Sequence, residues 1–165
     1  GYCAMEITEG DPLVHDIVKS PDYKRQLIDP VYPDTANSFL CHSMIMKALG
    51  EYAAAGWSSV FAGWICDDNN YTDAAKKCRE RALELFTKAT EAGQQFGNDR
   101  ISEKIYMIDL YRRCGRFQEA AEICDKELEK QHPSHTLDIL CFERDLIEKK
   151  DIASHSETEA EEADF

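Results

Sequence analysis

From residue 34 onwards, apolar residues recur at the three- and four-residue spacing of an amphipathic α-helix. The pattern is interrupted by glycine, by proline or by a short run of Asp and Asn, which are residues that end helices. Six helices are therefore predicted: from Asp34 up to Gly50, Tyr52 to Cys66, Thr72 to Ala92, Ile101 to Cys114, Phe117 to Lys130 and His135 to Lys150. The pattern predicts an all-α domain over residues 34–151.

The two ends of the chain differ from this middle part. Four prolines in residues 1–33 leave room only for short elements, at Leu13–Lys19 and Tyr23–Ile28. We predict an irregular lead-in there. Residues 152–165 are rich in Asp and Glu, so an acidic, disordered C-terminal tail is predicted.

The segment Tyr52–Cys66 is apolar or small on every side, a pattern typical of a buried central helix. Its aromatic residues, with those that flank it, are Tyr52, Trp57, Phe61, Trp64 and Tyr71. Aromatic side chains at helical spacing usually fill a core, and core packing is the main interpretation. The alternative is that they line a groove between helical hairpins.

An internal repeat is present. Tyr71-Thr-Asp-Ala-Ala-Lys-Lys-Cys78 reappears as Phe117-Gln-Glu-Ala-Ala-Glu-Ile-Cys124, an offset of 46 (117 minus 71). A weaker copy is Gly50-Glu-Tyr52-Ala-Ala-Ala55, which matches Gly115-Arg-Phe117-Gln-Glu-Ala120. The turns before these helices need a residue that tolerates positive φ, and Gly50, Asn69 and Gly115 are predicted to supply it.

The second copy resembles the tetratricopeptide repeat (TPR) family over Ile101 to Ser134. The residues that carry the resemblance are Tyr111, Gly115, Phe117, Ala120, Leu128 and Pro133. It implies antiparallel helical hairpins that stack. Ile108 stands where the family has a small residue, and the turns at Gly50 and Asn69 are too close for two regular repeats. A regular superhelix and an irregular bundle both remain open.

Two further segments, Ala62-Gly-Trp64-Ile-Cys-Asp-Asp68 and Phe142-Glu-Arg-Asp-Leu-Ile-Glu-Lys-Lys150, resemble the TPR-like part of a bacterial family whose domain has no known function. The resemblance covers residues 35–150. Members of that family carry a cysteine-rich zinc-binding segment before the helices, which this chain lacks. The resemblance therefore implies a fold and neither a metal site nor an activity.

The charge balance argues against nucleic acid as a ligand. The chain has 32 acidic and 19 basic residues, a formal net charge of -13, and its basic residues are scattered. Phosphate backbones are bound by clustered Lys and Arg. A membrane span is not expected either, because the longest uncharged stretch, Tyr52–Cys66, is too short.

The seven cysteines are an odd number and show no CxxC spacing, so neither a disulfide framework nor a zinc ribbon is expected. This favours a reducing, cytoplasmic location. Cys78 and Cys124 lie on apolar stripes and are predicted to be core residues, whereas Cys3 is predicted to be exposed.

Candidate catalytic chemistry is sparse. His132, His135 and Cys141 are potential zinc ligands, although such a site needs further donors. Asp67-Asp68 could bind a cation, but capping and solvation explain a turn aspartate equally well. The connector Gly93–Gly97 is predicted to be flexible and lacks the Lys-Ser or Lys-Thr of a nucleotide loop. No cofactor is expected.

The main hypothesis is a non-enzymatic module that binds a protein or peptide partner. Its site is predicted to be a basic island exposed by the helices on either side of Gly115, formed by Lys104, Arg112, Arg113 and Arg116, which would receive an acidic or C-terminal carboxylate peptide. The alternatives are a metal-dependent or other enzyme using His132, His135 and Cys141, or a homo-oligomeric scaffold. The homodimer seam would lie on the 52–66 helix or the last helix.

Overall fold

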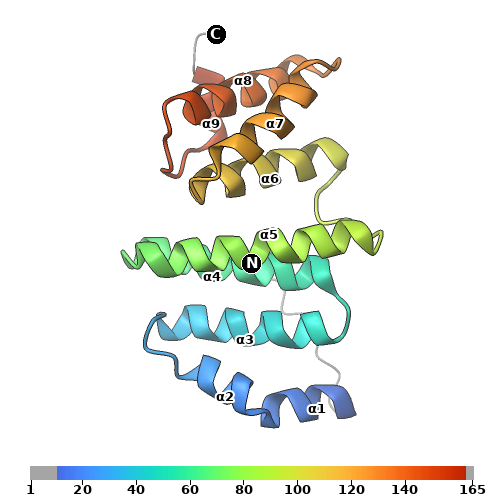
Figure 1. Cartoon of the computed structure of the whole chain (residues 1–165), viewed down its shortest axis with the longest axis vertical. Coiled ribbons are helices and arrows are strands. Elements are labelled where there is room, and N and C mark those ends of the chain that lie inside the picture. The colour runs from blue at the N-terminus through green and yellow to red at the C-terminus, as the bar shows by residue number, and fades with distance from the viewer. Residues whose placement is uncertain (1–10, 163–165) are drawn as a thin grey trace.

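The computed structural model describes residues 11–162, and all regular structure within them is helical (Figure 1). The helices are α1 (Pro12–Lys19), α2 (Pro21–Leu27), α3 (Asp34–Ala48), α4 (Tyr52–Asp68), α5 (Thr72–Glu91), α6 (Arg100–Arg113), α7 (Phe117–Leu128), α8 (Ser134–Glu148) and α9 (Glu157–Glu162). The all-α class is confirmed. Helices α3 to α8 match the six predicted helices to within two residues at each end.

The helices are stacked along the long axis of the molecule in nearly the order of the chain (Figure 1). Helix α4 packs on α3 and on α5, and α7 packs between α6 and α8. Helix α6 contacts α5 on one side and both α7 and α8 on the other. It therefore joins the lower and upper halves of the stack, which matters for the site described below.

Three helix-to-helix turns share one geometry. Gly50, Asn70 and Gly115 have φ values of 79°, 63° and 76°. In each turn the next residue donates its N–H to the carbonyl five positions earlier, for example Arg116 to Tyr111 at 2.9 Å. This is the bond of a Schellman motif, which requires a left-handed residue at its centre. Asn70 takes that conformation, so the assignment to Asn69 was wrong by one position.

These turns set the true register of the repeat. The fifth residue after each left-handed position is an alanine that is 0% exposed: Ala55, Ala75 and Ala120. Aligning the turns pairs Tyr71 with Arg116, an offset of 45 (116 minus 71), because each is the N-cap of the following helix. The 46-residue match in the sequence is therefore displaced by one position from the structural repeat. Gly50 and Gly115, which match in the sequence, occupy the same left-handed position in their turns.

The two short elements predicted in residues 1–33 are present as the helices α1 and α2, so the described part of the lead-in is mostly helical and not irregular. Each begins with proline at its first position, where a missing N–H costs nothing. The Asp11 carboxylate accepts from the N–H of Leu13 at 2.8 Å, and the Ser20 hydroxyl accepts from the N–H of Tyr23 at 3.2 Å. Val14, Ile17 and Tyr23 then pack against the buried cluster of Ile45, Met46, Ala55 and Leu85.

The predicted tail is ordered as far as the structure describes it. Helix α9 packs on α8, and its Ala160 is 2% exposed. A fully buried arginine, Arg112, donates to the carbonyls of Asp151 and Ala153 and so holds the segment that precedes α9.

The connector Gly93–Gly97 is held by two side-chain hydrogen bonds. Gln94 donates to the Gly50 carbonyl at 2.6 Å, and Trp57 donates to the Phe96 carbonyl at 2.8 Å.

The small residues of helix α4 are buried, but the helix is not buried on every side as its sequence predicted. Ala55, Ala62 and Cys66 are 0% exposed, whereas Trp64 is 46% exposed and Trp57 is half-buried. The small side chains let α3 and α5 approach closely, and the tryptophans point to the side that faces α6. Core packing holds for Tyr52 and Trp57, which pack against the buried cluster around Phe86. Trp57 and Trp64 also line a cavity, so the groove-lining alternative holds for them as well.

Gly56 is the position where this close approach is tightest. A Cβ atom on Gly56 would lie 2.5 Å from Cε1 of Phe86, a ring that is 0% exposed and stacked on Phe96 at a centroid distance of 4.2 Å. Gly56→Ala is expected to lower the free energy of unfolding, because overpacking costs typically about 1–3 kcal/mol and exceeds the roughly 1 kcal/mol that alanine gains in a helix. Urea unfolding measures the change.

Gly63 provides the matched control in the same helix. A Cβ there would lie 3.4 Å from Cβ of Cys78, an ordinary contact. Gly63→Ala is therefore expected to keep or raise stability. Equal losses at both glycines would contradict the packing of α4 against Phe86.

Candidate functional site

The four predicted partner-binding residues do not form one exposed island. Lys104 and Arg116 are exposed, but Arg112 is 0% and Arg113 is 7% exposed. The prediction that Arg112 and Arg113 are exposed was wrong. Neighbouring residues on a helix point about 100° apart, and α6 is covered on two sides, so each arginine enters a different interface.

Arg112 points toward α8 and bonds in four directions. Its Nε donates to the Glu143 carboxylate at 2.8 Å, and its Nη2 donates to Asp109 at 2.8 Å. Its Nη1 donates to the carbonyls of Asp151 and Ala153 at 2.8 and 3.0 Å. Burial raises the pKa of the Glu143 carboxyl, and the neighbouring Arg112 opposes that rise. This network fastens α6, α8 and the C-terminal segment together.

Arg113 points the other way, toward α4 and α5. Its Nη2 donates to Asp67 at 2.7 Å, and Nη1 of Arg79 donates to the same carboxylate oxygen at 2.8 Å. Arg79 is 5% exposed. Asp67 is therefore not simply solvated, because it pairs with two buried guanidinium groups. Neither arginine gave a local signal in the sequence, since Asp67 lies 46 positions from Arg113.

A cavity of about 150 Å³ lies beside this cluster, between α4, α5 and α6. We call it the aromatic cavity. Its lining consists of Trp57, Val60, Trp64, Arg79, Phe86, Tyr106, Asp109, Leu110 and Arg113. The Trp57 ring meets Tyr106 edge to face at 5.0 Å and Phe86 at 5.5 Å. The walls are mostly apolar, with the charged groups of Arg79, Arg113 and Asp109 among them.

Both arginines of the cavity have an unused donor. Nε of Arg79 and Nε of Arg113 are buried and have no hydrogen-bond partner among the described residues. A buried donor without an acceptor is costly and rare. The cavity therefore combines aromatic walls with two guanidinium groups that retain hydrogen-bonding capacity.

A larger groove of about 850 Å³ runs along the end of α5, the α5–α6 connector and the outer side of α6. We call it the connector groove. It is lined by Thr87, Thr90, Glu91, Gly93, Gln94, Gln95, Phe96, Asn98, Asp99, Arg100, Glu103, Lys104, Met107, Tyr111 and Ile123. None of these residues lines the aromatic cavity. The size suits a ligand larger than one side chain.

The charged residues of the connector groove differ in whether they have a hydrogen-bond or ion-pair partner. The Glu103 carboxylate accepts from the N–H groups of Phe96 and Gly97 at 2.8 and 3.3 Å, and Asp99 caps α6 by accepting from Ser102 at 2.8 Å. Arg100 and Lys104 are exposed and form no ion pair with another described residue. Glu91 and Asp99 are the exposed acids of the lining, and Glu103 is partly buried.

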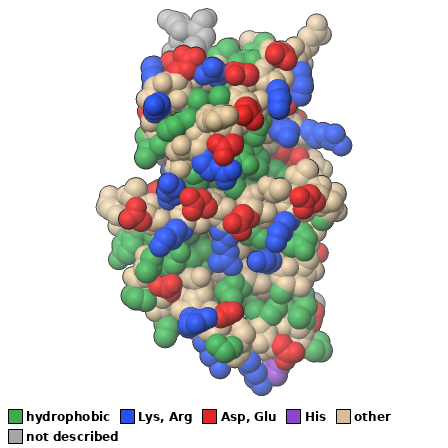
Figure 2. All heavy atoms as spheres, viewed as in Figure 1, with side chains coloured by type: hydrophobic (Ala, Val, Ile, Leu, Met, Phe, Trp, Pro, Cys, Tyr) green, Lys and Arg blue, Asp and Glu red, His purple; other side chains and the backbone are tan. Residues whose placement is uncertain are grey.

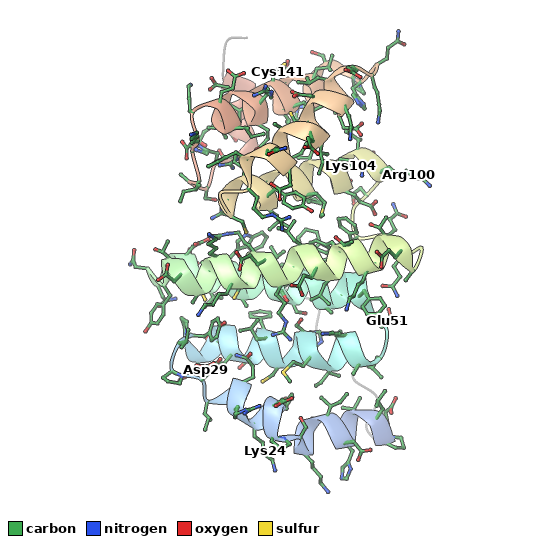
Figure 3. All side chains as sticks on the ribbon, viewed as in Figure 1. Lys24, Asp29, Glu51, Arg100, Lys104 and Cys141 are labelled. Carbon is green, nitrogen blue, oxygen red and sulfur yellow. The ribbon has the colours of Figure 1, made fainter. Side chains whose placement is uncertain are left out.

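Figure 3 shows Arg100 and Lys104 together at the N-terminal end of α6, beside the connector. Arg116 lies over the ring of Tyr111, 4.6 Å from its centroid, and Tyr111 lines the groove. Of the four predicted residues, Lys104 lines this groove, and Arg116 only contacts its Tyr111 ring; Arg112 and Arg113 do not line it. Along α5, acidic and basic side chains are interspersed on the face seen in Figure 2.

The candidate metal and thiol chemistry finds little support in the geometry. Among the described residues, no three His, Cys, Asp or Glu side chains are grouped as metal ligands. His132 lies instead 3.5 Å from Glu127. Cys78 and Cys124 are core residues, as predicted, and burial raises the pKa of each thiol to about 12. Cys3 lies outside the described residues.

The expected homodimer seam stays a prediction. On α4 the exposed apolar side chain is Trp64, whereas α1, α2 and the turn after them expose more: Leu13, Val18, Leu27, Ile28 and Val31.

Of the helices in the described part of the chain, none has the length and apolar character needed to cross a membrane.

Comparisons with models of protein families, with curated proteins and with solved structures gave no match. The function proposed below therefore rests on the residues and contacts of this chain alone.

Proposed function

We propose that this chain is a non-enzymatic, TPR-like helical scaffold that binds an acidic segment of a protein partner in the connector groove. The observation that carries the proposal is the pair of exposed cations on the groove rim. Arg100 and Lys104 are four residues apart on one face of α6, so they present a local positive charge.

The groove offers apolar contacts beneath that charge. Phe96 is 7% exposed, and Met107, Tyr111 and Ile123 are partly buried along the lining. Interfaces combine an apolar centre with a charged rim. A peptide with acidic residues beside apolar ones would match both parts.

The groove is also held in shape before any partner arrives. Gln94 bonds to the start of α4 through both ends of its amide, to the Gly50 carbonyl at 2.6 Å and from the N–H of Ala53 at 3.0 Å. The Glu103 carboxylate ties the connector to α6. A preformed site loses less conformational entropy on binding.

The TPR-like character is supported by the repeated turn geometry. The turns at Gly50, Asn70 and Gly115 place a fully buried alanine at the same position of the next helix. Stacked helical hairpins bury a common core and leave side surfaces for partners.

The core cysteines also agree with a binding role. Burial raises the pKa of the Cys78 and Cys124 thiols to about 12, so both are protonated and are not nucleophiles.

Charge reversal on the groove rim tests the proposal. Proteins retained by the immobilised chain from an extract of its native cells are compared for three forms: the wild type, the double variant Arg100→Glu and Lys104→Glu, and the control Lys19→Glu and Lys24→Glu. The control residues are exposed on α1 and α2, at the lower end of the stack and away from the groove. A specific partner is expected to be retained by wild type and control and lost from the groove variant.

Binding is also expected to weaken as the salt concentration rises, because exposed charges are screened over about 10 Å at 0.1 M salt. Retention that is the same for all three forms would contradict the proposal.

A further inference from the structure

The aromatic cavity has the features of a small-molecule site that is separate from the connector groove. Its volume of about 150 Å³ is below that of sites for drug-sized ligands, about 300–1,000 Å³, and is comparable to a cavity that accommodates benzene. It therefore suits a body of the size of one aromatic ring.

The charged groups in the cavity wall indicate that the ligand is an anion. Arg79 and Arg113 are each more than nine-tenths buried and share the single carboxylate of Asp67. The three groups together carry one excess positive charge. A ligand carboxylate would supply a negative charge to the two guanidinium groups that line the cavity.

We propose that the aromatic cavity binds a small aromatic monocarboxylate, with the ring among Trp57, Phe86 and Tyr106 and the carboxylate on Arg79 and Arg113. Edge-to-face contacts among aromatic rings are favourable, and the existing contacts of Trp57 show that the walls accept them.

Other ligand classes fit the same cavity less well. A cation would be repelled by the two guanidinium groups, even though aromatic cages often bind cations. A neutral aromatic molecule would leave the excess positive charge of Arg79, Arg113 and Asp67 without a counter-ion. Asp109, the acid of the lining, is already paired with Arg112 at 2.8 Å, so a ligand carboxylate binds on the side of Arg79 and Arg113.

The chain carries its own reporter for this site. It contains two tryptophans, Trp57 and Trp64, and both line the cavity. Phenylacetate is titrated into the full chain while tryptophan emission is recorded, and phenylacetamide serves as the neutral probe of the same shape. Phenylacetate is expected to change the emission saturably and to bind about tenfold more tightly or better than phenylacetamide, because it forms charge-assisted hydrogen bonds.

Two variants separate the charged wall from the apolar wall. Arg113→Met is expected to bind the two probes with equal affinity, since Asp67 then neutralises Arg79 alone. Trp64 is 46% exposed at the rim and can be replaced with little effect on folding. Trp64→Leu is expected to weaken both probes by the same factor, keep the preference for phenylacetate and leave Trp57 as the reporter.

An emission that does not change saturably with phenylacetate would overturn the proposal. So would equal affinity of the wild type for both probes, or a preference that survives in a folded Arg113→Met variant. Where that variant does not fold, the wild type and Trp64→Leu decide the question. No partner protein takes part, so failure here is independent of the connector groove.

Discussion

Replacing Arg112 by methionine is expected to lower the free energy of unfolding by about 3–5 kcal/mol, the cost of removing one member of a buried ion pair. Methionine keeps most of the apolar stem, but it leaves Glu143, which is 7% exposed, without its cation. The carbonyls of Asp151 and Ala153 also lose their donor. Urea unfolding measures the loss, and hydrogen exchange is expected to speed up in residues 151–160.

Two comparisons isolate the cause. Arg116→Met removes an exposed arginine from the same region, whose ion pair with Glu119 is worth at most about 1 kcal/mol. Adding Glu143→Leu to Arg112→Met is expected to recover part of the loss, because it removes the unpaired buried carboxylate. Equal losses for Arg112→Met and Arg116→Met would show that Arg112 does not hold the upper half of the stack together.

Replacing Asp67 by asparagine is expected to cost about 3 kcal/mol, near the lower end of the range for breaking a buried pair. The substitution keeps the shape but leaves Arg79 and Arg113 as two buried, neighbouring cations. The cost is reduced because the Asp67 side chain is 29% exposed and partly solvated. For a chain of this length, the expected fall in Tm is roughly 6–12 °C.

Asp68 is the control for this change, since it is the next residue and is exposed. Asp68→Asn is expected to alter stability by no more than about 0.5 kcal/mol. A thermal unfolding experiment on both variants decides between the two roles. If Asp67→Asn were as stable as Asp68→Asn, the shared carboxylate would not be what joins α6 to α4 and α5.

The sequence predicted the helices well because their signals are local. The turn residues Gly50 and Gly115 and the apolar spacing between them place α3, α4, α6 and α7 to within two residues. The Asp11-Pro12 and Ser20-Pro21 pairs were equally local signals for the starts of α1 and α2. The irregular lead-in was predicted instead because proline was interpreted only as a residue that breaks helices.

The candidate site was predicted only in part, because its contacts are long-range. Adjacent basic residues such as Arg112 and Arg113 usually mark a solvated helix face. Their burial depends on Glu143 and Asp67, 31 and 46 positions away, and on α6 being covered on two sides. Nothing near these residues in the sequence shows that. Lys104 lies on the groove rim, whereas the role of Arg100 was missed.

The repeat illustrates the same limit. Cys78 and Cys124 match in the sequence, yet the turns pair Tyr71 with Arg116, one position away from that match. Small apolar residues at neighbouring positions pack equally well on a buried helix face, so the residue identities alone did not determine how the two copies of the repeat align. The left-handed residues Asn70 and Gly115 fix it, because the backbone geometry of the turn admits one position only.

Site-specific photo-crosslinking tests the proposed partner site most directly. A photoreactive residue is placed at Gln95, which is exposed in the connector groove, or at Ile28, which is 77% exposed at the end of α2 and away from the groove. The expected result is an adduct from position 95 alone, with an acidic segment of one protein, that disappears when Arg100→Glu and Lys104→Glu are added. An adduct that persists after both charge reversals, or that forms equally from position 28, would contradict binding in the connector groove.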